Sequence, residues 1–391
     1  MGFIETMYEK ARENRKRVVV PECTNPSMMR AAVRAAADGI ADVSFVGDAD
    51  ACMSAAEANG IDLSGIAIVD ICDEAYRNDL LERFAALPRR GFSSKSVAKR
   101  IENPLYMALL MEAVGDADCT FGGLDTTTSE FVMATQGIIG LAPNVVVPSG
   151  MLIMEIDGYE GAQGNIFGMS DGAINVEPSS DHLSAIALAS CDTFTALTGD
   201  AARCAMLSYS TDGSGNSPSV QKVREGVEKA RTLRPDLKID GEFQADAAIV
   251  ERVAAKKVKR ASDVAGRANV LVFPDAAAAN IATKLIQQFA PGRSYGPIYQ
   301  GFARRHRGSH LFQFRVLQRH GIGELAKERR INGLQRQHPQ AETISEERVD
   351  RRRGSDAFRA RPGRSRCGRH ERGGAVRLCG ARCHEGCRRR R

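Results

Sequence analysis

Short runs of β-branched and apolar residues alternate with helical patterns through residues 1–302 of this 391-residue chain. The runs read RVVVP (17–21), VSFVGD (43–48), IAIVD (66–70), DCTFGG (118–123), NVVVPSG (144–150), MLIMEI (151–156), INVEP (174–178), CAMLSYST (204–211) and ANVLVFPD (268–275). Apolar runs of this kind, separated by helices, are typical of parallel strands that are buried on both faces. The pattern therefore predicts an α/β fold.

The segment 157–172 (DGYEGAQGNIFGMSDG) interrupts this alternation, because it is rich in glycine and has no clear period. It suits a long hairpin or a connection between domains. A second irregular position is Gly296-Pro297, which predicts a tight turn.

Charge divides the chain near Phe302. Residues 1–302 contain 29 Lys and Arg against 39 Asp and Glu, out of totals of 54 and 48, whereas residues 303–391 contain 25 and 9. The net charge therefore changes from −10 to +16, and Lys327 is the only lysine of the second part. A tail so rich in charge cannot bury enough apolar surface to fold, and we expect it to be disordered. Its attraction to polyanions would carry no sequence specificity.

Cysteine usage and the absence of targeting patterns suggest a cytoplasmic protein. Six cysteines lie in apolar settings in the body, with no spacing typical of a disulfide framework or a zinc site. The tail cysteines follow a C-x11-C-x3-C-x3-C spacing that fits no common zinc pair, so no metal is predicted. No apolar run is long enough to span a membrane, and the charged N-terminus lacks a signal-peptide core.

Several reaction classes are disfavoured by what residues 1–302 lack. His182 is the only histidine there, and its setting predicts a helix start capped by Ser180 or Asp181. A Ser-His-Asp triad would have to use this residue. The HExxH, GxGxxG and GxxxxGK[ST] motifs do not occur.

Four hydroxyl- or glycine-rich segments remain as candidates for ligand binding. They are GGLDTTTS (122–129), LSYSTDGSGNS (207–217), FPDAAAAN (273–280) and YGPIYQGF (295–302). Three of them follow predicted strands, and parallel sheets bind ligands at the carboxyl ends of their strands. Hydroxyl and backbone N–H donors suit a small anionic ligand. Each segment taken alone also reads as an ordinary polar turn or helix cap.

In order along the chain, these segments resemble the phosphate acetyltransferase and phosphate butyryltransferase family. The most specific motifs are LSYSTDGS (207–214) and IDGEFQADAAIV (239–250). They are accompanied by VVVPE (18–22), GIADVSFVG (39–47), NPLY (103–106), GDAD (115–118), LDTTT (124–128), GYE (158–160), FPD (273–275) with Asn280, and YGPIYQGF.

The resemblance implies two α/β domains with parallel sheets and an active site in the cleft between them, similar to isocitrate and isopropylmalate dehydrogenases. Domain one would comprise residues 1–145 and domain two residues 146–298, with the chain returning to domain one near residue 299. The implied reaction moves an acetyl or similar short acyl group between coenzyme A and inorganic phosphate, without a metal or cofactor. Members of the family are commonly homodimers.

The resemblance also nominates site residues. Phosphate and the acyl substrate would be bound by Thr126, Thr127, Thr128, Ser208, Ser210, Thr211, Gly213, Ser214, Asp275, Asn280, Tyr295, Gly296 and Gln300. The basic pair Arg89 and Arg90 is assigned to coenzyme A. No catalytic residue is assigned.

The chain departs from the family after Phe302. There the family continues with a D-x-S-R-G segment, which supplies a serine, an arginine and a general-base aspartate, and with a final helix. Here the chain reads ARRHRGSHLF, and no D-x-S-R-G follows. We interpret residues 303–391 as an out-of-frame product, with a fused basic extension as the alternative. Two function hypotheses follow: an active phosphate acyltransferase, or an inactive acyltransferase body with a basic tail.

Overall fold

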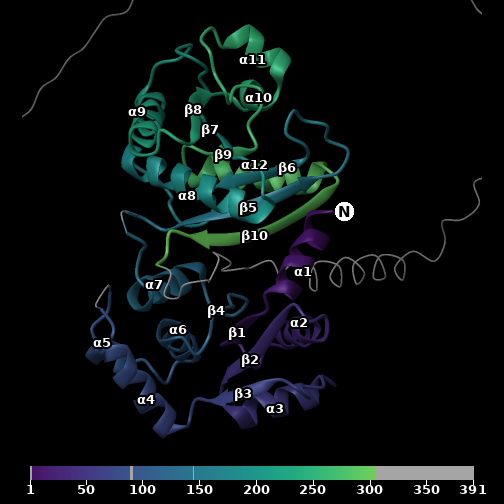
Figure 1. Cartoon of the computed structure of the whole chain (residues 1–391), viewed down its shortest axis with the longest axis vertical. Coiled ribbons are helices and arrows are strands. Elements are labelled where there is room, and N and C mark those ends of the chain that lie inside the picture. Colours follow the sequence, from purple (N-terminus) through teal and green to yellow (C-terminus); the bar gives the residue numbers. More distant parts are fainter. Residues whose placement is uncertain (1, 89–90, 144, 304–391) are drawn as a thin grey trace, which may run out of the picture. The chain divides into compact units, whose positions relative to one another are not determined.

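The structure is a computed structural model that describes residues 2–88, 91–143 and 145–303. The predicted tail, residues 303–391, lies outside the described residues apart from Ala303. Within the described ranges, the chain forms two β-sheets flanked by helices, as Figure 1 shows. The predicted α/β class is confirmed.

The first sheet has four parallel strands in the order β3-β2-β1-β4. Its strands are β1 (Lys16–Val20), β2 (Ala41–Gly47), β3 (Ala67–Asp70) and β4 (Cys119–Thr120). The helices of this part are α2 (Pro26–Ala37), α3 (Ala49–Ala58), α4 (Glu74–Ala85), α5 (Ser94–Ala98), α6 (Pro104–Val114) and α7 (Thr128–Ile138). Buried residues of α2, β1 and β2 form one core cluster, and α6 contributes most of another.

The second sheet has six strands in the order β10-β5-β6-β9-β7-β8. Its strands are β5 (Ser149–Ile156), β6 (Ile166–Ser170), β7 (Arg203–Leu207), β8 (Lys238–Phe243), β9 (Val270–Val272) and β10 (Gly292–Gln300). Strands β6, β9, β7 and β8 are parallel, whereas β5 runs antiparallel to both β6 and β10. The helices of this part are α8 (Ser180–Thr198), α9 (Pro218–Leu233), α10 (Ala245–Ile249), α11 (Glu251–Lys257) and α12 (Ala276–Phe289).

Each end of the described chain packs against the sheet or helices formed by the other half of the chain. The first helix, α1 (Phe3–Glu13), packs on the second sheet, where the rings of Phe3 and Tyr295 lie 5.1 Å apart. At the other end, Phe302 pairs with Leu141 and is buried in the cluster formed by α6 and α7. The sheets use residues 16–120 and 149–300, so residue 145 falls between them. The domain boundaries themselves stay a prediction.

Side-chain caps explain why many helices start directly after a strand or turn. Asn25, Asp48 and Asp73 accept backbone N–H groups at the starts of α2, α3 and α4. These residue types satisfy N–H groups that have no partner within the helix. The cap of α8 is Ser179 rather than the predicted Ser180 or Asp181, and it accepts the N–H of His182 at 3.2 Å.

Three local predictions are wrong. Residues 145–147 of the predicted NVVVPSG run are not a strand, because β5 begins only at Ser149. INVEP is also not a strand, since the Asp171 carboxylate accepts the N–H groups of residues 173–175 and removes them from any ladder. The pair Gly296-Pro297 lies inside β10 at an irregularity in its pairing with β5, rather than in a tight turn. The hairpin expected for residues 157–172 is present, because β5 and β6 pair antiparallel there.

Candidate functional site

Most of the predicted ligand segments gather at one edge of the second sheet. Strands β6, β7, β8 and β9 are parallel, so the loops at their carboxyl ends share that edge. The end of β10 lies there too, because β10 and β6 are both antiparallel to β5. The Lys222 ammonium connects α9, the helix that follows segment 207–217, to segment 273–280, since it donates to the Pro274 carbonyl at 2.9 Å.

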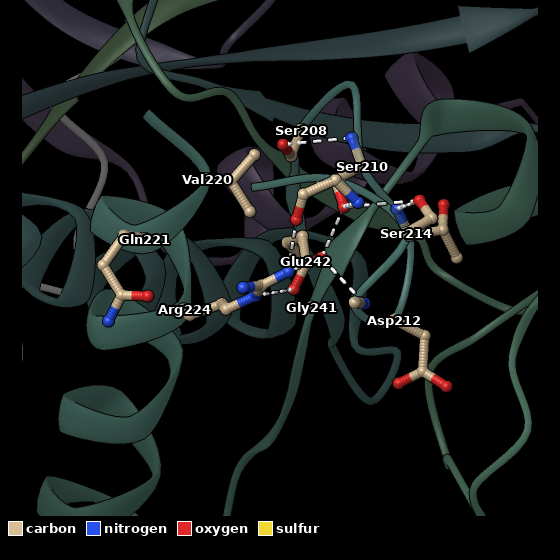
Figure 2. Close-up of polar contacts among 12 residues, drawn as sticks. Ser208, Ser210, Asp212, Ser214, Val220, Gln221, Arg224, Gly241 and Glu242 are labelled. Atoms are coloured by element: carbon tan, nitrogen blue, oxygen red, sulfur yellow. Dashed lines mark hydrogen bonds and ion pairs between the residues drawn. The ribbon is translucent and has the colours of Figure 1, made fainter. Parts of the chain in front are cut away.

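The loop after β7, residues 208–217 (the serine loop), is ordered around one buried carboxylate. Glu242 of β8 accepts a hydrogen bond from the Ser210 hydroxyl at 2.7 Å and from the Gly213 N–H at 3.1 Å. The Ser210 hydroxyl in turn accepts the Gly215 N–H at 2.8 Å. Figure 2 shows the Ser210 hydroxyl beside this carboxylate, with Ser208 and Ser214 next to Ser210.

Arg224 of α9 completes this arrangement. Its Nε lies 2.8 Å from one Glu242 oxygen and its Nη2 lies 2.9 Å from the other, as Figure 2 shows. The same Nη2 donates to the Gly215 carbonyl at 2.9 Å. A bidentate arginine–carboxylate pair fixes geometry as well as charge. The pair therefore connects β8, α9 and the serine loop.

The environment keeps Glu242 ionised. Burial opposes the charged form, but the hydrogen bonds from Arg224, Ser210 and Gly213 outweigh it and lower the pKa of Glu242 from 4.5 to about 2. A carboxylate in this state accepts hydrogen bonds and releases no proton near neutral pH. Its position suits an organising role for the loop.

Burial divides the five predicted residues of the serine loop into three groups. Ser210 and Thr211 are buried, and Thr211 also accepts the Gln244 N–H at 2.9 Å. Gly213 and Ser214 are exposed, and Ser208 is half-buried. The loop runs into α9, whose 16 residues begin after the cap Ser217. Helix N-termini attract anions because their N–H groups and dipole point outward.

The threonine loop, residues 122–129, is held in a similar way by Glu22. This buried carboxylate accepts the N–H groups of Gly123 at 2.6 Å, Leu124 at 2.8 Å and Thr126 at 3.1 Å. These backbone donors, which the sequence offered for an anion, are therefore bonded to Glu22. Thr127 is the N-cap of α7 and accepts the Glu130 N–H. Thr128 is the first residue of that helix.

Two predicted residues lie at the start of α12. Asp275 is its N-cap and accepts the Ala278 N–H at 2.8 Å, and Asn280 is exposed one turn later. Gly172, after β6, approaches this turn closely, because a Cβ there would lie 3.5 Å from the Asn280 nitrogen. The loops after β6 and β9 are thus in contact.

The three predicted residues of β10 are internal. Tyr295 is 1% exposed, and its hydroxyl donates to Glu155 at 2.8 Å within the core. Gly296 has a φ of +117°, and a side chain there would meet the Met151 carbonyl. The buried Gln300 amide donates to Ser149 and Ser190 at 2.9 Å each. Tyr295 and Gly296 thus make the contacts of core residues. Gln300 is also buried, but it is the last residue of β10 and lies at the carboxyl end of that strand.

The two arginines that the resemblance assigns to coenzyme A cannot be located in the structure. Arg89 and Arg90 lie outside the described residues. In the described ranges, no group of three or more His, Cys, Asp and Glu side chains is arranged to hold a metal ion. None of the described helices is long and apolar enough to cross a bilayer.

Sequence reasoning did not nominate the side chains that organise the two loops. Glu242 lies in the IDGEFQADAAIV motif and Glu22 ends the VVVPE motif, but neither was assigned a role. Arg224 carried no signal beyond a helical pattern. An acidic residue at the carboxyl end of an otherwise apolar strand was the available signal, because a buried charge needs partners.

A four-stranded parallel sheet, a mostly parallel six-stranded sheet and polar loops at the strand ends define an α/β protein of the class in which ligands bind at the carboxyl ends of parallel strands. The chain belongs to the phosphate acetyl/butaryl transferase family, which it matches over residues 2–306. It is 37% identical over 302 residues to the phosphate acetyltransferase of Thermoanaerobacterium thermosaccharolyticum, covering 77% of this chain and 91% of that protein.

Two solved structures agree with this assignment. A phosphotransacetylase from Streptococcus pyogenes is similar with a TM-score of 0.69 and 28% identity, over 84% of this chain and 100% of that one. A phosphotransacetylase from Staphylococcus aureus gives 0.68 and 29%, over 78% and 94%. The family predicted from the sequence is therefore confirmed for residues 2–306.

Proposed function

We propose that residues 2–303 are the substrate-binding body of a phosphate acyltransferase, which moves an acetyl or similar short acyl group between coenzyme A and inorganic phosphate. The observation that carries the proposal is the 37% identity to a phosphate acetyltransferase, which extends over 91% of that relative. The reaction needs no metal or cofactor, and coenzyme A is a substrate.

The serine loop supports a role in holding the phosphate group. Ser214 is exposed and Ser208 is half-buried in the loop that runs into the N-terminus of α9. Asp212, the charged residue of this loop, is paired with Arg260. In the direction of acyl-CoA synthesis, the thiolate of coenzyme A attacks the carbonyl carbon of the acyl phosphate. The bond from that carbon to the phosphate oxygen then breaks, and inorganic phosphate leaves with the electron pair.

Turnover depends on the segment after Phe302. The family's serine, arginine and general-base aspartate lie in D-x-S-R-G, and this chain has no such segment there. General acid–base assistance is worth roughly 10²–10⁴ in rate. We therefore expect this chain to bind its substrates and to catalyse acyl transfer slowly. If the rate falls to zero, the chain is the inactive acyltransferase body with a basic tail.

The test is acetyl-CoA formation from acetyl phosphate and coenzyme A. The full chain is compared with a chimera in which the residues after Phe302 are replaced by a family-type D-x-S-R-G ending. We expect the chimera to be at least about 100-fold faster. An inactive but folded chimera would contradict the proposed function, whereas activity of the natural chain within about tenfold of the chimera would contradict the role given to the missing segment.

The remaining properties stay predictions. They are the homodimer, the absence of specific nucleic-acid binding, the cytoplasmic location and the meeting of the threonine and serine loops in one inter-domain cleft.

A further inference from the structure

A negative charge lies directly beneath the loop that we assign to an anionic substrate. The Glu242 side chain is 3% exposed and bonds to Ser210 and Gly213 of the serine loop. An uncompensated carboxylate at this position would repel phosphate, since two negative charges in a partly buried site interact strongly. To bind an anion, the loop therefore needs either a neutral hydrogen-bond acceptor in place of Glu242 or a nearby cation that cancels its charge.

Arg224 is placed to act as that cation. It forms the bidentate pair with Glu242 and also bonds to the Gly215 carbonyl. Its side chain is 30% exposed, ten times the fraction of the acid that it neutralises. The positive member of the pair is thus nearer to solvent, the side from which an anion would arrive.

The other charged groups near Glu242 have their own partners. Asp212 pairs with Arg260, and Asp240 pairs with Arg231 and Arg260. Lys257 pairs with Asp246 and bonds to Gln244. The uncharged Tyr209 side chain near Arg224 is exposed. Within the described residues, Arg224 is the one cation that forms a salt bridge with Glu242.

We propose that Arg224 is a positioning residue that makes the serine loop receptive to an anion, because it cancels the charge of Glu242 while leaving the carboxylate to order the loop. This inference rests on the proposed function, in which the serine loop holds the phosphate group of the substrate. Arg224 need not touch the substrate, since its effect acts through Glu242.

A distinctive pH dependence follows. In the wild-type chain, Glu242 stays ionised and compensated, so anion affinity should vary little with pH. With methionine at position 224, the pKa of Glu242 rises because burial remains and the cation is gone. The carboxylate is then charged and repulsive at high pH but takes up a proton as the pH falls. Anion affinity of the variant should therefore recover in acid.

The test measures sulfate binding by calorimetry, because sulfate keeps a charge of −2 across the range used. The full chain is compared with Arg224→Met, with Arg224→Met/Glu242→Gln and with Arg231→Met at about pH 5 and about pH 8. Arg231 is the matched control, because it lies on the same helix and pairs with Asp240, a buried acid of the same strand. Circular dichroism confirms that each variant is folded.

We expect Arg224→Met to weaken sulfate binding by about tenfold or more at the higher pH, and by clearly less at the lower pH. The double variant should bind within about threefold of wild type at both, because glutamine keeps the acceptor for Ser210 and Gly213 without the charge. Arg231→Met should bind like wild type.

An equal loss at both pH values, or a double variant as weak as the single one, would overturn the proposal. If Arg224→Met does not fold, the double variant decides: wild-type affinity supports the inference and lost affinity overturns it. Ser214→Ala distinguishes the assignment of the serine loop to the anion from the role proposed for Arg224. Wild-type sulfate binding that is insensitive to Ser214→Ala would count against the loop assignment itself, whereas sensitivity to Ser214→Ala without any effect of Arg224→Met would overturn only this inference.

Discussion

At the scale of single residues, two buried glutamates hold the two candidate loops in the same way. Glu22 lies two residues beyond the end of β1 and accepts N–H groups from the loop after β4, the neighbouring strand. Glu242 lies near the end of β8 and accepts from the loop after β7, again a neighbour. In both cases a glutamate side chain accepts hydrogen bonds from loop donors that would otherwise lack partners. The hydroxyl-rich loops are therefore organised by acids from adjacent strands.

A stability prediction follows for Glu242. Its pKa is lowered from 4.5 to about 2 in the folded chain, so its ionisation stabilises the fold above the unfolded pKa, and this contribution is lost as the pH falls toward 2. Glu242→Gln should lower the free energy of unfolding at neutral pH, by at most about 3 kcal/mol. The difference from wild type should shrink steadily between about pH 5 and pH 2.

Urea denaturation across this pH range measures the effect. Glu225→Gln is the control, because Glu225 is exposed on α9 next to Arg224, and this change should cost at most about 0.5 kcal/mol. A difference between Glu242→Gln and wild type that is the same at every pH would show that ionisation of Glu242 does not stabilise the fold.

At the scale of elements, the sequence predicted the parallel architecture because β1, β2, β7 and β9 are short apolar runs. Strands β8 and β10 were not predicted, because polar residues and glycine interrupt them. The prediction failed where side chains bind backbone groups, as Asp171 does with residues 173–175. For the site, the hydroxyl-rich segments were visible as sequence, but their partners were not. Glu242 lies 32 residues beyond Ser210, and Glu22 lies 101 residues before Gly123, so only the strand order brings them together.

The start of α7 gives a prediction at this scale. Thr127 was nominated for phosphate binding, and the structure makes it the N-cap of the helix, with its hydroxyl accepting the Glu130 N–H. Thr127→Ala should therefore destabilise the fold by about 1 kcal/mol, and Thr127→Asn should restore most of the loss. Thermal unfolding reports this difference. Thr128→Ala, inside the first turn, is the matched control and should change stability by less than about 0.5 kcal/mol. Equal effects of the two alanine variants would contradict the capping role.

At the scale of the whole molecule, the family match and the charge change coincide. The match ends at residue 306, and the net charge changes sign near Phe302, from −10 before it to +16 after it. The basic residues change in kind as well, because the 25 Lys and Arg of the tail include only one lysine. Selection for a basic surface uses both residue types, whereas a shifted reading of GC-rich DNA yields arginine, glycine, alanine, proline and cysteine with little lysine.

The coding sequence tests this interpretation directly. We predict that one of the other two reading frames, followed from just after the Phe302 codon, encodes D-x-S-R-G and then an apolar helical segment. The reason is that the family match ends at residue 306, just beyond Phe302, where the family that the sequence resembles continues with D-x-S-R-G and a final helix. Reading the same frames before Phe302 is the control and should give no family motif. If neither alternative frame encodes D-x-S-R-G, residues 303–391 are a fused basic extension and the frame interpretation is wrong.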